Sequence, residues 1–142
     1  MTKILLIHGP NLNLLGEREP ASYGMKTSQT ILEDLKKEFP NIELDYVQSN
    51  SESDLVDAIQ ASSATFHGIL INAGAFSHTS IAIADALRSI KLPAISVHLT
   101  NIYQREGFRH SDIIGEACQG AIVGLGTDGY ALALECLLEK LY

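Results

Sequence analysis

Residues 4–23, ILLIHGPNLNLLGEREPASY, begin as a predicted strand and continue as a long irregular segment. The apolar run at 4–7 predicts the strand, and Gly9-Pro10 ends its pairing because proline lacks an amide hydrogen. Glu19-Pro20 argues against a helix at that point, so we expect little regular structure before about Thr27. A compact domain seldom carries so long an irregular segment unless the segment is a lid or a binding loop.

The polar part of this segment is bracketed by Gly16 and Gly24, which could act as hinges of a mobile lid over residues 16–24. Between the two glycines lie Arg18 and Tyr23, a cation and a phenol. A solvated loop with one charged residue and one anchoring aromatic would have the same composition. Both interpretations stay open on this stretch alone.

Outward from this stretch, predicted strands and helices alternate to the end of the chain. Further strands are expected at 42–46, 68–72, 94–98 and 121–125. Apolar residues recur at helical spacing within 31–39, 55–59, 81–90 and 134–141. A second long polar connection, residues 99–117, has room for one helical turn.

This alternation predicts an α/β fold in which a parallel sheet lies between two layers of helices. Five strands and 142 residues suit one domain, residues 1–142, with the flavodoxin-like strand order 2-1-3-4-5. The sequence contains no internal repeat, low-complexity tract or linker. In open sheets of this kind a ligand binds beyond the carboxyl ends of the strands, near the switch point between strands 1 and 3.

The polar clusters of the sequence follow the strands whose ends meet at that edge. They are Asn11, Asn13, Arg18 and Tyr23 after the first strand, Asn72 and Ser77–Ser80 after the third, and His98, Thr100, Asn101, Arg105 and Arg109 at the end of the fourth. Each residue taken singly can be explained as a turn residue or a helix cap. Their convergence on one edge favours a binding site.

Charge and composition narrow the classes of function. The net charge of −7 argues against non-specific nucleic-acid binding. Three of the four arginines nevertheless fall in the two long loops, which favours a carboxylate or phosphate ligand. Cys118 and Cys136 lack CxxC spacing, and the N-terminal apolar run is too short for a signal peptide or a membrane span. We therefore expect a cytoplasmic protein without a nucleic-acid or membrane partner.

The loops lack the motifs of several common sites. No GxxxxGK[ST] or GxGxxG follows the first strand, the five histidines show no HxxxH or HExxH spacing, and there is no GxSxG elbow. What remains is acid–base chemistry without metal or nucleotide. Tyr23 beside a guanidinium suits a base, and His98 or His78 can donate a proton near neutrality. Asn11 and Asn72 offer donors for a developing oxyanion.

At these residues the chain resembles the type II 3-dehydroquinate dehydratases. The matching motifs are GPNLNLLGEREPASYG (9–24), INAGAFSHTSIAIADAL (71–87), VHLTNIYQREGFRH (97–110) and GLGTDGYALALE (124–135). The resemblance implies a flavodoxin-like subunit that needs no cofactor. It also implies anti elimination of water from 3-dehydroquinate through an enolate, giving 3-dehydroshikimate in the shikimate pathway.

The resemblance also implies roles for four catalytic residues. Tyr23 would be the general base, and Arg18 the group that polarises it. Asn11 would hold the water that stabilises the enolate. His98 would be the acid that protonates the departing hydroxyl.

Substrate-binding roles are carried over in the same way. Asn72 and the Leu99-Thr100 backbone would hold the substrate carboxylate, while His78 and Arg109 would bind ring hydroxyls. Asp85 would reach the substrate of a neighbouring subunit in a trimer. Four trimers would make the dodecamer of this family.

The sequence departs from the family pattern on the acid side of the site. The family usually has a glutamate two residues before the acid histidine, where this chain has Ser96. After Phe108-Arg109-His110 it usually has a second polar residue and then Ser-Tyr, where this chain has Ser111-Asp112-Ile113. His8 stands where asparagine is commoner.

Serine brings no negative charge to the acid histidine. We therefore expect activity to persist but to fall earlier on the alkaline side than in relatives with glutamate, unless water or a neighbour such as Glu106 substitutes. Two other classes stay open: a non-catalytic relative of the family, suggested by Ser96, and a metal-dependent hydrolase or lyase built on the histidines.

Overall fold

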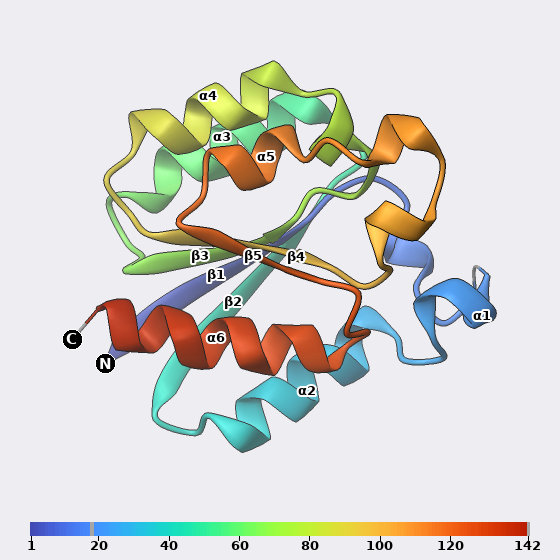
Figure 1. Cartoon of the computed structure of the whole chain (residues 1–142). Coiled ribbons are helices and arrows are strands. Elements are labelled where there is room, and N and C mark those ends of the chain that lie inside the picture. The colour runs from blue at the N-terminus through green and yellow to red at the C-terminus, as the bar shows by residue number, and fades with distance from the viewer. Residues whose placement is uncertain (18, 142) are drawn as a thin grey trace.

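Five parallel strands form one sheet in the part of the chain that the structure describes, residues 1–17 and 19–141 of this computed structural model. The strands are β1 (Thr2–His8), β2 (Ile42–Gln48), β3 (Gly68–Asn72), β4 (Ala94–His98) and β5 (Gly120–Val123). Their order is β2-β1-β3-β4-β5, so the predicted fold class and strand order are confirmed (Figure 1). Every residue of β3 and β4 is buried, because these strands lie inside the sheet with helices on both faces.

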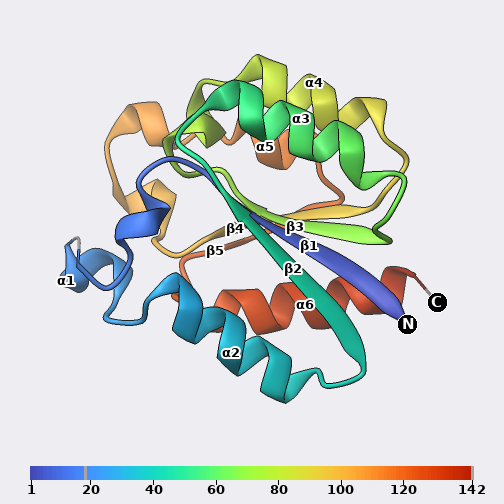
Figure 2. The ribbon, with the colours of Figure 1, turned by 180° about the vertical axis from the view of Figure 1, so that it is seen from behind.

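The long helices cover the two faces of the sheet. Figure 1 shows α3 (Glu52–Ser62), α4 (Ile81–Ser89) and the short α5 (Ile113–Glu116) on one face, and α2 (Ser28–Glu38) and α6 (Asp128–Lys140) on the other. The same division is visible from behind in Figure 2. The chain is therefore a three-layer α/β sandwich, as its alternating pattern predicts.

Two hydrophobic cores lie on the two faces of the sheet, and β1 contributes to both. Ile4 and Leu6 join the core under α2 and α6, whereas Leu5 and Ile7 join the core under α3 and α4. Successive side chains of a strand point to opposite faces, so a strand covered on both sides needs a continuous apolar run. This requirement explains the apolar residues that open the chain.

The remaining short helices gather at the carboxyl ends of the strands. They are η1 (Leu12–Leu14), α1 (Pro20–Tyr23), η2 (Gly74–His78), η3 (Ile102–Gln104) and η4 (Gly107–Arg109). The expectation of no helix at Glu19-Pro20 is wrong, because proline at the first helical position loses only an amide that has no partner there. The connection 99–117 holds two 3-10 turns and α5 rather than one turn.

The end of the last strand also needs correction. β5 stops at Val123, since Gly124 turns the chain away with φ at 86°. Within the described residues, none of the helices is both long enough and apolar enough to cross a membrane.

A close backbone approach brings the exits of β1 and β3 together. The amide of Gly9 donates to the carbonyl of Asn72 at 2.8 Å, and a Cβ on Gly9 would overlap the carbonyl of Ala73. Only glycine allows this contact. The loops that follow the two strands therefore start side by side, at the switch point of the sheet.

Candidate active site

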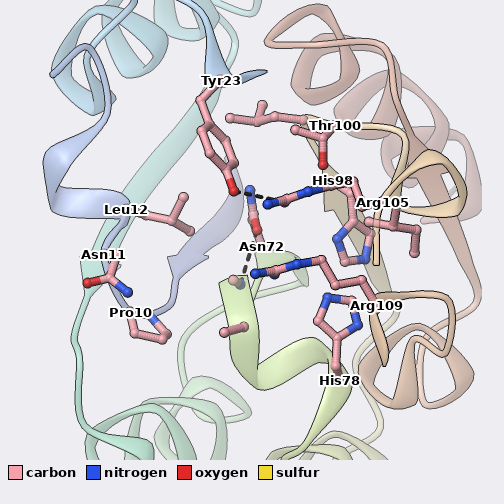
Figure 3. A pocket seen from close by; sticks show the side chains of 14 residues that line it. Pro10, Asn11, Leu12, Tyr23, Asn72, His78, His98, Thr100, Arg105 and Arg109 are labelled. Atoms are coloured by element: carbon pink, nitrogen blue, oxygen red, sulfur yellow. Dashed lines mark hydrogen bonds between the residues drawn. The ribbon is translucent and has the colours of Figure 1, made fainter. Parts of the chain in front are cut away.

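A pocket of ≈ 110 Å³ lies at this edge, among the loops that follow β1, β3 and β4 (Figure 3). It is lined by Pro10, Asn11, Leu12, Tyr23, Asn72, Gly74, Ala75, His78, His98, Leu99, Thr100, Ile102, Arg105 and Arg109. The pocket lies at the edge of the sheet where the sequence predicts a binding site. Its size suits a small molecule rather than a dinucleotide.

The phenol of Tyr23 meets a guanidinium at one side of the pocket. Arg105 Nη1 donates to Tyr23 Oη at 2.8 Å, and the guanidinium carbon lies 5.5 Å from the centre of the tyrosine ring (Figure 3). This contact holds the phenol hydroxyl at the wall of the pocket, where a general base could reach a bound ligand. The predicted partner, Arg18, lies outside the described residues. The sequence predicts Arg105 only as one of the loop arginines suited to an anion, so its contact with Tyr23 is not foreseen by the local pattern.

His98 meets a carboxylate on the opposite side of the pocket. Its Nε2 donates to Asp112 Oδ2 at 2.7 Å, and Ser96 Oγ donates to the same oxygen at 3.2 Å. Burial opposes ionisation of this carboxyl, but the hydrogen bond and charge of His98, with the bonds from Gly115 and Ser96, hold the pKa of Asp112 below its ordinary value. A neighbouring carboxylate therefore substitutes for the glutamate that is missing at position 96. The partner is Asp112 rather than Glu106.

Asn72 is held by a buried hydrogen-bond chain under the pocket. The amide of Gly74 donates to Asn72 Oδ1, so Asn72 Nδ2 donates to Tyr130 Oη at 3.0 Å. The hydroxyl hydrogen of Tyr130 then points to His8 Nε2 at 2.7 Å, and His8 Nδ1 donates to Tyr46 Oη at 2.9 Å. Each side-chain polar atom in this series of hydrogen bonds has a partner, which fixes the orientation of the Asn72 amide.

The chain of hydrogen bonds requires a neutral imidazole at its centre. Burial lowers the pKa of His8 to about 3, and burial also raises the pKa of the Tyr130 phenol well above its ordinary value. Neither group can therefore gain or lose a proton as an acid or a base near neutrality, although both make hydrogen bonds. Their role is structural support for Asn72.

The other predicted binding residues contribute polar groups to the same pocket. The ring of His78 stacks on that of His98 with 6.2 Å between centroids, and its Nδ1 donates to the carbonyl of Ser111 at 2.8 Å. Arg109 Nε donates to Glu106 at 2.6 Å, and this hydrogen bond lowers the pKa of that carboxyl. Leu99, Thr100 and Asn11 also line the pocket.

Asp85 does not belong to this pocket within its own chain. It lies on α4 with its side chain 70% exposed, and Arg88 Nη1 is 3.7 Å from its carboxylate. A role at the site of a neighbouring subunit stays a prediction.

The side chains lining the pocket that carry a permanent charge are the guanidinium groups of two arginines. Arg105 and Arg109 extend into it, and none of the described residues that line it is an aspartate or a glutamate (Figure 3). Such a pocket selects an anionic ligand. In the described ranges 1–17 and 19–141, no three or more His, Cys, Asp or Glu residues are grouped as a metal site would require.

A phenol with a guanidinium, an imidazole with a carboxylate and amide donors between them form an acid–base site for a small anion. The sequence profile of the family described as dehydroquinase class II matches residues 2–138. The chain belongs to this family. The match covers nearly the whole length, so the family assignment applies to both halves of the pocket.

Two dehydroquinase relatives have similar length and high identity. The 3-dehydroquinate dehydratase of Bacillus cytotoxicus is 49% identical over 143 aligned residues, covering 99% of this chain and 98% of the relative. That of Halothermothrix orenii is 46% identical and covers 98% of this chain and 95% of its own.

Solved dehydroquinase structures share the fold of this chain. The type II dehydroquinase of Butyrivibrio crossotus superposes with a TM-score of 0.93 at 41% identity, over 96% of this chain and 97% of that one. A 3-dehydroquinate dehydratase-like protein from Bifidobacterium longum is more distant, with a TM-score of 0.71 at 26% identity over 100% and 99% of the two chains. None of these similarities favours a non-catalytic relative over the enzyme.

Proposed function

We propose that this class II dehydroquinase removes water from 3-dehydroquinate to give 3-dehydroshikimate, a step of the shikimate pathway. The observation that carries the proposal is the pairing of Tyr23 with Arg105 and of His98 with Asp112 across one cationic pocket. The first pair holds the phenol that would act as the base, and the second holds the imidazole that would act as the acid. The substrate is a small carboxylate, which matches the charge of the pocket.

The elimination needs one base and one acid. The Tyr23 phenolate removes a proton from the carbon next to the ketone, and the electrons of that C–H bond form an enolate. Asn11 holds a water molecule against the enolate oxygen. The enolate then collapses, the C–O bond of the hydroxyl on the adjacent carbon breaks, and His98 supplies the proton that turns the leaving group into water.

The remaining pocket residues orient the substrate. Asn72 and the backbone of Leu99-Thr100 bind the carboxylate, and His78 and Arg109 bind ring hydroxyls. These contacts account for anti elimination, because they hold the proton to be removed and the departing hydroxyl on opposite faces of the ring.

A lid of residues 16–24 closes over the bound substrate. Gly16 and Gly24 have φ at 91° and 79°, conformations that favour glycine, at the two ends of this segment. Tyr23 enters the pocket from the lid, and Arg18 belongs to the same segment. Closure therefore brings the base to the substrate and excludes water from the enolate.

The enzyme works as an oligomer, a dodecamer built of trimers, in the cytoplasm. Ile81 and Asp85 lie one helical turn apart on α4, and the isoleucine is 65% exposed. An exposed isoleucine beside a carboxylate suits a subunit interface through which Asp85 reaches the neighbouring site. Both cysteines are unpaired, which fits a reducing compartment.

The proposal is tested by following the absorbance of the conjugated enone after 3-dehydroquinate is added to the purified protein. Wild type should produce the enone, and Tyr23→Phe should do so at least about 100-fold more slowly while staying folded. Asp57→Asn, a change of charge on the exposed face of α3, is the matched control and should behave as wild type. Absence of enone with wild-type protein would refute the proposed function.

A further inference from the structure

We propose that Asp112 is the positioning residue of the acid, so that the carboxylate supporting His98 comes from the start of α5 and not from β4. This inference rests on the proposed function, since it assigns the support of the group that protonates the leaving hydroxyl. With Asp112 as the carboxylate, the serine at position 96 no longer indicates a non-catalytic relative of the family.

Asp112 is fixed at both of its oxygens. It is the N-cap residue of α5, and its Oδ1 accepts from the amide of Gly115 at 2.8 Å. This bond turns Oδ2 toward β4, where it accepts from His98 at 2.7 Å and from Ser96 at 3.2 Å. The carboxylate side chain is only 11% exposed and that of the histidine 6%, so little solvent screens the pair.

Ser96 completes this arrangement instead of replacing a carboxylate. It lies two residues before His98 on the same face of β4 and is fully buried. Its hydroxyl hydrogen goes to Asp112, and its oxygen lies 3.3 Å from His98 Nε2. A serine here leaves room for the Asp112 carboxylate, which a larger acidic side chain at position 96 would crowd and repel.

The geometry also gives the two ring nitrogens of His98 different roles. Nε2–H of His98 is committed to Asp112, and within the described chain no hydrogen bond is made by Nδ1. The proton for the leaving hydroxyl therefore departs from Nδ1, which leaves a neutral imidazole that still donates through Nε2 to Asp112. The carboxylate thus holds the ring and its tautomer before and after the transfer.

Other charged and titratable groups lie around His98 and its partner Asp112. They are His78 stacked on its ring, Arg105 and Arg109 from the loop after β4, Tyr23 from the lid and, behind Asp112, the Cys118 thiol, whose pKa is raised to about 12 mainly by burial. Asp112 is the described carboxylate in hydrogen-bond contact with His98. Loss of its charge should therefore have a large effect.

The variant Asp112→Asn tests the charge separately from the helix cap. Asparagine caps helices as well as aspartate does, so α5 should stay intact. In the ligand-free protein, the ring resonances of His98 measured by NMR should titrate at lower pH in the variant than in wild type, because the neighbouring negative charge is gone. The kcat should fall about tenfold or more, and its alkaline limb should move to lower pH. Asp57→Asn should change none of these quantities.

A double variant moves the carboxylate to the other element. Ser96→Glu combined with Asp112→Ser places an acidic side chain on the same face of β4 as His98. This protein should recover most of the His98 titration and kcat that Asp112→Ser alone loses. Failure of the double variant to exceed Asp112→Ser would overturn the proposal, because the site would then need something other than a nearby carboxylate.

The NMR titration needs no turnover, so it separates this inference from the proposed function. A wild-type protein without activity on 3-dehydroquinate would defeat the function and leave the titration to decide the role of Asp112. A wild-type His98 titration in Asp112→Asn would defeat the positioning role, even in a fully active enzyme.

Discussion

The side chain of Arg105 lies 82 residues from Tyr23 in sequence and 2.8 Å from its hydroxyl in space. Its guanidinium holds the Tyr23 hydroxyl by a hydrogen bond, so Arg105→Gln should misplace the base and lower kcat by about 100-fold. The measurement is kcat between pH 5 and 9. Lys37→Gln, on the exposed side of α2, is the control for loss of one positive charge. A profile of Arg105→Gln that overlays wild type would leave Tyr23 without this support.

A second residue-scale prediction concerns the buried imidazole of His8. The pKa of His8 is lowered to about 3 by burial, while an unfolded chain binds the proton near pH 6.5. As pH falls, the unfolded state therefore binds the proton of His8 before the folded state does. The contribution of His8 to the unfolding free energy is at its full value above pH 6.5 and decreases as pH falls toward 3. Its slope is about 1.4 kcal/mol per pH unit.

Urea unfolding of wild type and His8→Asn at pH 7.5 and pH 5.0 measures this contribution. Wild type should lose about 2 kcal/mol more unfolding free energy than the variant between the two values. Asparagine can still hydrogen-bond to Tyr130 but cannot take up a proton. Equal losses in the two proteins would mean that His8 is not the group whose protonation destabilises the fold.

At the scale of elements, α1 enters the site from a segment that begins and ends at glycines with positive φ. None of the described residues of α1 is buried. By contrast, α4 has four buried residues, Ile83, Ala84, Ala86 and Leu87. Low burial means low local stability. The lid 16–24 should therefore open without ligand and close on substrate.

Limited trypsin digestion tests the closing of this lid. The free protein should be cut within 16–24, after Arg18, and 3-dehydroquinate should slow the cut in the folded but slow variant Tyr23→Phe. Cleavage elsewhere in the chain serves as the internal control and should not respond to the substrate. Equal rates of cutting within the lid at zero and saturating substrate would contradict a closing element.

At the scale of the whole molecule, the proposed trimer makes each site depend on two chains. Light scattering should give a particle several times larger than the 15.4 kDa subunit. Asp85→Asn should lose turnover although its own pocket is intact. Mixing it with Tyr23→Phe subunits should restore part of the activity, because some sites then combine a native Tyr23 with a neighbour's native Asp85.

The mixing experiment separates an interface role from a local one. Activity that stays at the level of the two single variants after subunit exchange would show that Asp85 does not serve a neighbouring site. A monomeric particle at working concentration would contradict the trimer itself.

Local sequence patterns determined the layers of this protein and the edge at which the pocket lies. Each pattern has a direct physical cause: a strand covered on both faces must be apolar throughout, a surface helix must bury one stripe, and parallel strands bring their carboxyl ends together. The strand order and the convergence of Tyr23, Asn72 and His98 follow from those causes and were predictable. Motif resemblance then supplied the expected chemistry.

Only the tertiary structure decided which groups support the base and the acid. Arg105 and Asp112 reach Tyr23 and His98 from loops whose paths depend on turns, caps and packing, and no periodicity in the sequence encodes those paths. Taken alone, Ser96 suggested that the acid histidine had lost its carboxylate neighbour. The alternation of side chains along a strand relates His98 only to residues two positions away on the same strand. The charge is supplied by Asp112, 14 residues after His98, since α5 packs against β4 and places its N-cap beside the histidine.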